Sequence, residues 1–111
     1  MMSTNGIWKV EMLGPYGWES MATAFFEDGK YWAASENHYT VGTYKVSRNR
    51  IEISAVGVQH GKARTVFGSK KKEMNLKLEG KIKGGEIKGQ AQDDKGAYQI
   101  SFRCTRLADL S

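Results

Sequence analysis

The sequence predicts an all-β protein, a single antiparallel up-and-down β-barrel of about eight strands. The 111 residues include 13 glycines and one proline, and β-branched and aromatic residues stand in short runs between Gly, Asn and Asp, which is typical of strands joined by tight turns. Apolar residues recur at every second position, and no segment keeps a 3.6-residue helical period. So many strands in so short a chain must close into a barrel or form a sandwich or bent meander. Glycines inside expected strands favour the barrel because they permit sharp bends; they are Gly42, Gly57, Gly80 and Gly89.

Five strands are expected in the first half of the chain, over residues 7–12, 20–26, 31–34, 38–46 and 51–58. From Trp8 to Met12 apolar residues alternate with charged ones, whereas residues 20–26 are apolar or small on both faces. The Asp28-Gly29 pair supplies the positive φ that a tight hairpin requires. In the fifth strand the apolar positions change face near Gly57, which predicts a bulge or bend at this glycine.

The second half of the chain has the clearest alternation, in expected strands over residues 63–67, 74–79, 87–91 and 98–104. Gly84-Gly85 and the segment 93–96 are suited to hairpin turns between them.

Length and composition indicate one domain over residues 1–111. The single Cys excludes an internal disulfide, and together with two His it leaves no ligand set for a structural zinc ion. The first residues lack a basic segment followed by an apolar stretch, and no apolar run is long enough for a membrane span. We therefore expect a cytoplasmic protein that does not contact a membrane.

The net charge of +5 is unevenly distributed. Residues 1–60 hold five basic and six acidic residues, whereas residues 61–111 hold 12 basic and six acidic ones. The densest cluster, Lys70-Lys71-Lys72, is a candidate partner-binding site, although lysines on the polar face of strands ordinarily form a solvated exterior that protects against edge pairing. Nine of the 12 aromatic residues precede residue 61, so aromatic and basic residues are segregated. This separation disfavours nucleic-acid binding, which combines both on one surface.

No catalytic or cofactor-binding constellation is recognisable, so the sequence predicts no enzyme, no metal site and no cofactor. His38 opens an expected strand and His60 ends one, and both are interpreted as exposed or edge residues. Cys104 shares a face with apolar residues and is interpreted as a buried, inert thiol, while Arg103 points to the other face. The glycines around residues 80–89 lack the strand, loop and helix context of a phosphate-binding loop.

The interior of such a barrel is filled by side chains or holds one small apolar ligand. A packed core is the ordinary outcome for large aromatic residues. The candidate ligand-binding residues are the large side chains on expected inward faces: Trp8, Phe25, Tyr44, Met74, Leu76, Tyr98 and Phe102.

Several segments resemble the GrlR-like family, named after a negative regulator of type III secretion. They are GIWKVEM at residues 6–12, FEDGK at 26–30, YTVGTY at 39–44, LKLEG at 76–80 and GEIKG at 85–89. The resemblance spans nearly all of residues 6–106 and implies a lipocalin-like (calycin) barrel of eight strands, frequently dimeric, with an apolar interior. The best-known member restrains transcription by binding an activator through an acidic loop. This basic chain has no acidic cluster, and residues 33–35 read Ala-Ala-Ser where the family usually has Gly-Gly-Asp.

These observations favour a non-enzymatic regulatory or interaction protein. We expect it to form a homodimer, to have a protein partner and to act as a negative regulator through protein–protein binding. The alternative is a carrier or sensor of a small apolar ligand inside the barrel. Nucleic-acid binding through the basic second half is the third and weakest hypothesis. A hollow interior would favour the carrier, and a close-packed interior would favour recognition at the surface.

Overall fold

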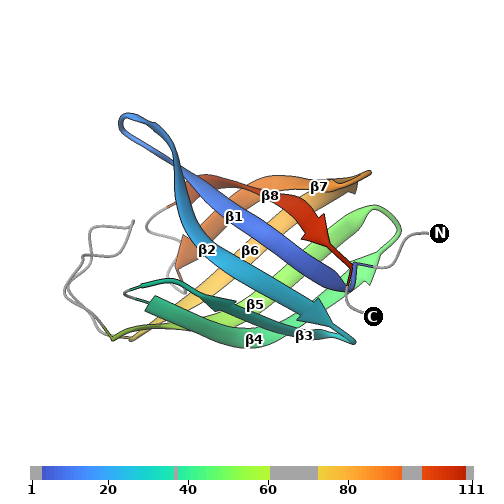
Figure 1. The fold of residues 1–111 in the computed structure, drawn as a ribbon, viewed down its shortest axis with the longest axis horizontal. Helices are drawn as coiled ribbons and strands as arrows, with labels where there is room; N and C mark the ends of the chain where they lie inside the picture. Colours follow the sequence, from blue (N-terminus) through green and yellow to red (C-terminus); the bar gives the residue numbers. More distant parts are fainter. Residues whose placement is uncertain (1–3, 37, 61–72, 94–98, 110–111) are drawn as a thin grey trace.

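The structure is a computed structural model that describes residues 4–36, 38–60, 73–93 and 99–109. Each strand pairs antiparallel with the next one along the chain, and β8 pairs with β1 to close the sheet (Figure 1). The described residues contain no helix, so the predicted up-and-down barrel is confirmed. The strands are β1 (Gly6–Gly14), β2 (Gly17–Glu27), β3 (Lys30–Ala34), β4 (His38–Ser47), β5 (Arg50–Gln59), β6 (Glu73–Lys83), β7 (Glu86–Asp93) and β8 (Gln99–Ala108).

Most strand boundaries lie within two residues of the sequence pattern, but β6 and β8 end at Lys83 and Ala108, four residues beyond the expected ends, and the first hairpin also differs. The break expected between residues 12 and 20 is only a two-residue turn, because β1 and β2 stay paired as far as Gly14 and Gly17. In Figure 1 the tip of this hairpin extends beyond the rest of the barrel. The Asp28-Gly29 hairpin is confirmed by φ angles of 50° and 86°. The strand expected over residues 63–67 lies outside the described residues.

A β-bulge in the first hairpin decides which residues of β2 face the interior. Val10 pairs with Ala22 and Glu11 pairs with Ser20, so Met21 is an extra residue in β2. Beyond this bulge Phe26 is fully buried, whereas Phe25 is 38% exposed. The predicted inward position of Phe25 is therefore wrong. Because residues 20–26 are apolar on both faces, alternation in the sequence could not decide between the two phenylalanines.

The bulge predicted at Gly57 is also wrong. The register of β5 with β6 runs without a shift through Ala55–Leu76 and Gly57–Met74, so both Ala55 and Gly57 stay on the inner face. A Cβ atom at Gly57 would lie 3.2 Å from Cδ1 of Leu76. The missing side chain therefore leaves space inside the barrel.

At Gly42 and Gly89 the backbone of the neighbouring strand leaves no room for a side chain. A Cβ at Gly42 would overlap the carbonyl oxygen of Ser54, and one at Gly89 would overlap that of Glu79. Neighbouring backbone segments approach closely at these points because no side chain separates them.

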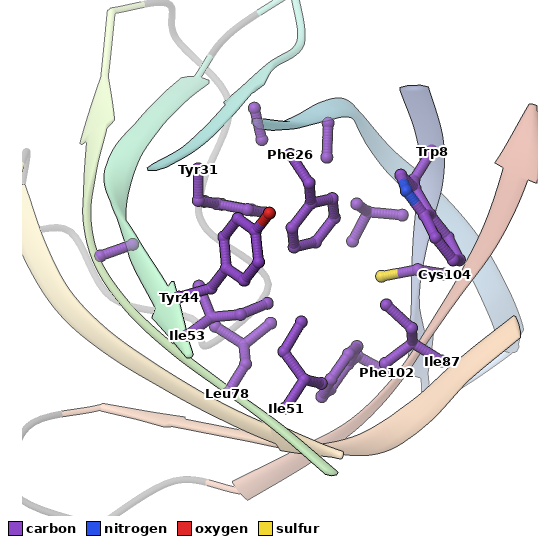
Figure 2. Packing of buried hydrophobic residues seen from close by; sticks show 14 of the residues in the cluster. Trp8, Phe26, Tyr31, Tyr44, Ile51, Ile53, Leu78, Ile87, Phe102 and Cys104 are labelled. Atoms are coloured by element: carbon purple, nitrogen blue, oxygen red, sulfur yellow. The ribbon is translucent and has the colours of Figure 1, made fainter. Parts of the chain in front are cut away.

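Large side chains fill the interior of the barrel near the start of β1 and the end of β8 (Figure 2). The ring of Phe26 makes edge-on contacts with Trp8, Tyr31 and Tyr44, with centroids 5.8, 5.0 and 5.0 Å apart. Such edge-to-face pairs add to the stability gained from burial. The other large, fully buried side chains are Phe102, Ile51, Ile53, Ile87 and Cys104.

Hydrogen bonds around Asn5 lie at this end of the barrel. Asn5 Oδ1 accepts bonds from the hydroxyl of Tyr44 at 2.9 Å and from the main-chain nitrogen of Asp28 at 3.0 Å. The guanidinium of Arg106 donates to the carbonyl of Asn5 at 2.8 Å and lies 4.6 Å from the ring centroid of Trp8. The hydroxyl of Tyr44 is thereby satisfied, and the chain around Asn5 is tied to Asp28 and Arg106 at this end of the barrel.

Candidate binding site inside the barrel

A cavity of about 90 Å³ lies toward the end of the barrel opposite the start of β1 and the end of β8. Its apolar lining comes from the ends of four strands. The bulge adds Met21 and Ala22 to the lining, and Gly57 contributes space, as described above. The larger apolar lining residues are Val10, Met12, Met21, Met74, Leu76 and Leu78.

Three of these side chains are methionines, which changes what the cavity can accommodate. Met12, Met21 and Met74 come from β1, β2 and β6 and face the same space. Methionine is unbranched and polarizable, so it adapts its shape to a neighbour more readily than leucine or isoleucine does. The volume of the cavity can therefore increase through rotamer changes without displacement of the strands.

Polar groups gather at one side of the cavity, at the β3–β4 turn and the end of β5. They are Ser35, His38, Thr40 and Gln59. Ser35 holds the turn closed, because its main-chain nitrogen donates to the carbonyl of His38 at 2.8 Å and its Oγ accepts from the main-chain nitrogen of His38 at 3.2 Å. The main chain of His38 is thus fixed at the rim of the cavity.

The imidazole of His38 carries a buried atom, Nε2, that has no hydrogen-bond partner in the described part of the chain. Burial lowers the pKa of His38 below its usual value, and the nearby His60 adds to this effect. The side chain therefore favours the neutral state, in which one ring nitrogen donates and the other accepts.

Of the two histidines interpreted as exposed or edge residues, His60 is exposed, whereas His38 begins β4 and is only partly exposed. His60 is exposed and stacks on Tyr39 with ring centroids 6.0 Å apart. His38 is half-buried and lines the cavity. His38 stands two residues before Thr40 in the same strand, so the sequence places both side chains on one face. At the end of a strand, however, the sequence does not reveal whether that face is covered.

The candidate ligand-binding residues separate into different environments. Trp8, Tyr44 and Phe102 face the interior as predicted, but they belong to the packed region and do not line the cavity. Met74 and Leu76 do line it. Phe25 faces outward, and Tyr98 lies outside the described residues.

Sequence reasoning missed Met12, Met21 and His38 as cavity residues. Met12 shares its face of the strand with Trp8 and Val10, so its inward position could have been found from the alternation. Met21 reaches the cavity only because of the bulge, which no local sequence signal announces.

Lys70, Lys71 and Lys72 lie outside the described residues, so the candidate partner-binding cluster stays a prediction. The later lysines occupy the outer face, as the alternation predicts. They are Lys77, Lys81, Lys83 and Lys88, all exposed. Lys77 and Lys88 form ion pairs with Glu79 and Glu86, both at 3.4 Å.

Cys104 is buried, as predicted, and burial raises its pKa to about 12. The neighbouring Arg103 faces outward, where it pairs with Glu11 at 3.0 Å and stacks over Trp18. Within the described ranges no three His, Cys, Asp or Glu side chains are grouped as a metal site would need. Nor do those ranges include a helix with the length and apolar character for crossing a membrane.

A second feature lies on the outside of the barrel. Directly paired residues of β1 to β5 place five apolar side chains in one line across the outer face. This outer apolar row consists of Ile7, Phe25, Trp32, Val41 and Val56. Trp32 is 40% and Val41 43% exposed. Exposed apolar side chains that adjoin one another mark a surface suited to contact with another molecule.

Fold and site together define a small closed β-barrel that is packed at one end and has an apolar cavity at the other. No protein-family model matches the chain, and no curated protein matches it.

Proposed function

We propose that this protein is a non-enzymatic binding protein that takes up a small apolar molecule in the cavity of its barrel. The observation that carries this proposal is the contrast between the two ends. The end near the start of β1 and the end of β8 is filled by aromatic rings and tied together by hydrogen bonds, whereas the opposite end contains an unfilled apolar cavity. A barrel that served only as a scaffold would gain stability from packing at both ends.

The size of the cavity restricts the ligand. A volume of about 90 Å³ is smaller than the ~150 Å³ of an apolar cavity that binds benzene. It therefore accommodates a short alkyl segment. Movement of the three methionine side chains extends this limit to somewhat larger apolar groups.

Methyl NMR of protein labelled with ¹³C at the methionine methyl groups tests the proposal directly, because three methionines line the cavity. With 1-chlorobutane as the probe, we expect the resonances of Met12, Met21 and Met74 to shift in a saturable manner. Absence of any shift at the solubility limit of the probe would refute the proposal.

A pair of glycine variants provides the matched control. A Cβ in Gly57→Ala would lie 3.2 Å from Leu76 and 3.7 Å from Thr40, so the new methyl group occupies part of the cavity. We expect its affinity for 1-chlorobutane to fall about fourfold, the equivalent of one buried methylene group at ~0.8 kcal/mol. Gly85→Ala adds the same methyl group in the β6–β7 turn, 3.8 Å from Arg106, and should leave the affinity unchanged.

A second candidate function is protein–protein interaction through the outer apolar row, with a second copy of this chain as the partner. The row itself is uncharged, and the sequence segment that contributes it, residues 1–60, has nearly balanced charges. The basic excess belongs to residues 61–111, none of which contributes to the row, so two copies joined through β1 to β5 bring together surfaces of nearly balanced charge. A regulatory role of the kind that the GrlR-like resemblance implies belongs to this second candidate.

Sedimentation equilibrium tests the second candidate with two tryptophan variants of similar exposure. Trp32 is 40% and Trp18 is 39% exposed, but Trp18 lies in the β1–β2 hairpin over Arg103 and not in the row. Trp32→Lys should abolish dimers, while Trp18→Lys should leave them intact. A wild-type protein that stays monomeric at high concentration would exclude this candidate.

A further inference from the structure

We propose that the cavity selects small uncharged molecules that carry one carbonyl group, and that the hydroxyl group of Tyr31 donates a hydrogen bond to the carbonyl oxygen. This inference rests on the proposed function, since it names the ligand class for the same site. Its basis is that one apolar cavity combines a phenol hydroxyl without a partner among the described residues and a lining without charged side chains.

The hydroxyl of Tyr31 belongs to the wall of the cavity. Tyr31 lies on the inner face of β3 and lines the cavity, and Figure 2 shows its side chain pointing into the barrel. The hydroxyl forms no hydrogen bond with the described part of the chain. It is also not one of the inaccessible polar atoms that lack a partner there, so a water-sized molecule reaches its oxygen. Because Tyr31 faces inward, its 4% exposed area is part of the cavity surface.

The hydroxyl of Tyr31 remains protonated and can donate. Burial raises the pKa of Tyr31, and the nearby Cys104 adds to this effect. A protonated phenol has one hydrogen to donate. A carbonyl oxygen is the complementary group, because it accepts this hydrogen bond and brings no donor of its own that would need a partner in an apolar space.

Tyr31 stands apart from the polar residues of the lining. It pairs with Gly42 in β4, and in the same strand Thr40 and His38 follow two and four residues away, which is about 7 and 13 Å at about 3.3 Å per residue. Water molecules find partners among the polar residues at that distant side. A water molecule bound to Tyr31 is replaced by the carbonyl oxygen, which accepts the same hydrogen bond, while the alkyl groups of the ligand cover the apolar wall.

The lining favours an uncharged ligand. The described lining residues include no Lys, Arg, Asp or Glu. Burial and the nearby His60 both lower the pKa of His38, which favours the uncharged imidazole in this lining residue as well. A carboxylate, phosphate or ammonium group would therefore enter the cavity without an opposite charge, at a high cost in free energy. A short ketone avoids this cost.

The test compares butan-2-one with 2-methylbut-1-ene, in which a CH₂ group replaces the carbonyl oxygen and cannot accept a hydrogen bond. Both are titrated into protein with labelled methionine methyl groups. Tyr31→Phe removes one oxygen atom and keeps the ring. Tyr44→Phe is the matched control, because the hydroxyl of Tyr44 donates to Oδ1 of Asn5 at 2.9 Å and Tyr44 does not line the cavity. The methyl and backbone spectra of each variant report whether the barrel is intact.

For Tyr31→Phe we expect the affinity for butan-2-one to fall about three- to tenfold, the range for loss of one neutral hydrogen bond, while the affinity for 2-methylbut-1-ene stays within about twofold. Tyr44→Phe should change the affinity for neither probe. Equal effects of Tyr31→Phe on the two probes would overturn the role of Tyr31 and leave the proposed function standing. Binding of neither probe to the wild-type protein would overturn both proposals.

Urea denaturation without ligand gives a second readout for the same two variants. Tyr44→Phe should lower the free energy of unfolding, because it removes the hydrogen bond to Asn5. Tyr31→Phe should not lower it, because the hydroxyl of Tyr31 has no partner within the described residues. An equal loss of stability in both variants would mean that the hydroxyl of Tyr31 is already bound by the protein, which would overturn the inference.

Discussion

Phe25 and Phe26 are adjacent in β2 and occupy opposite sides of the barrel wall, so replacing each by alanine tests the assignment of the two faces. Phe26 is fully buried and its ring contacts Trp8, Tyr31 and Tyr44. Phe25 is 38% exposed and lies in the outer apolar row between Ile7 and Trp32. The two substitutions remove the same atoms from neighbouring positions, so helix or strand propensity cannot account for a difference between them.

The two expected magnitudes are well separated. Truncation of a fully buried phenylalanine costs about 3–5 kcal/mol, because the loss of transfer free energy is joined by the cost of the cavity left behind. Phe26 should lie in the upper part of this range, because each edge-to-face pair contributes about 0.5–1.5 kcal/mol beyond burial. Phe25→Ala loses a cross-strand pair on the outer face, for which we expect about 1 kcal/mol or less.

Urea denaturation, followed by circular dichroism or tryptophan fluorescence, gives the free energy of unfolding for each variant. Measurements at several protein concentrations separate intrinsic stability from any contribution of a second copy bound at the outer apolar row. If Phe25→Ala destabilised the monomer as much as Phe26→Ala does, the assignment of the inner and outer faces of β2 would be refuted.

Three further predictions concern other parts of the barrel. The thiol of Cys104, whose pKa burial raises to about 12, should not react with Ellman's reagent at pH 8 in the native protein and should react fully in denaturant; rapid reaction of the native protein would contradict its burial. Gly89→Ala should reduce the free energy of unfolding, measured in urea, by about 1–3 kcal/mol. The reason is that the added Cβ would overlap the carbonyl oxygen of Glu79. An unchanged stability would mean that β6 and β7 separate easily. NMR titration should place the pKa of His38 below the usual 6.5, and His60→Phe should raise it because the charge of His60 is removed. The native state then binds fewer protons than the unfolded state, so the free energy of unfolding should fall as the pH drops through about 6.5 and below. His38→Gln should make the stability less dependent on pH. A pKa of His38 above that of a model peptide would contradict this prediction.

Alternation in the sequence predicts the strands that the structure describes, because apolar and polar residues separate where one face is buried and the other faces solvent. The choice of a closed barrel over a sandwich depends in addition on the glycines inside the strands. Alternation failed at Phe25, where both faces of the strand are apolar, and at Gly57, where Val56 and Val58 lie on the outer face and imitate a change of phase. These errors share one physical cause, since apolar residues on an outer face carry the same local signal as residues in a core.

The cavity was harder to predict than the fold. Met74 and Leu76 were identified because they alternate with polar residues, but their proximity to Met21 and His38 depends on the bulge and on closure of the sheet between strands distant in sequence. Whether a barrel interior is filled depends on the sum of side-chain volumes at one level of the barrel, which no local pattern reports.

The pairing of β1 with β8 has a consequence for how this chain folds. Residues as far apart as Ile7 and Ala108 must meet before the sheet closes, and contacts of such long sequence separation form slowly because loop closure costs entropy. Until β8 has been synthesised, β1 presents an unpaired edge and the apolar face that carries Trp8 lacks its full cover. Substitutions that weaken the β1–β8 seam should therefore lower the yield of folded protein during synthesis more than they lower the stability of molecules that have already folded.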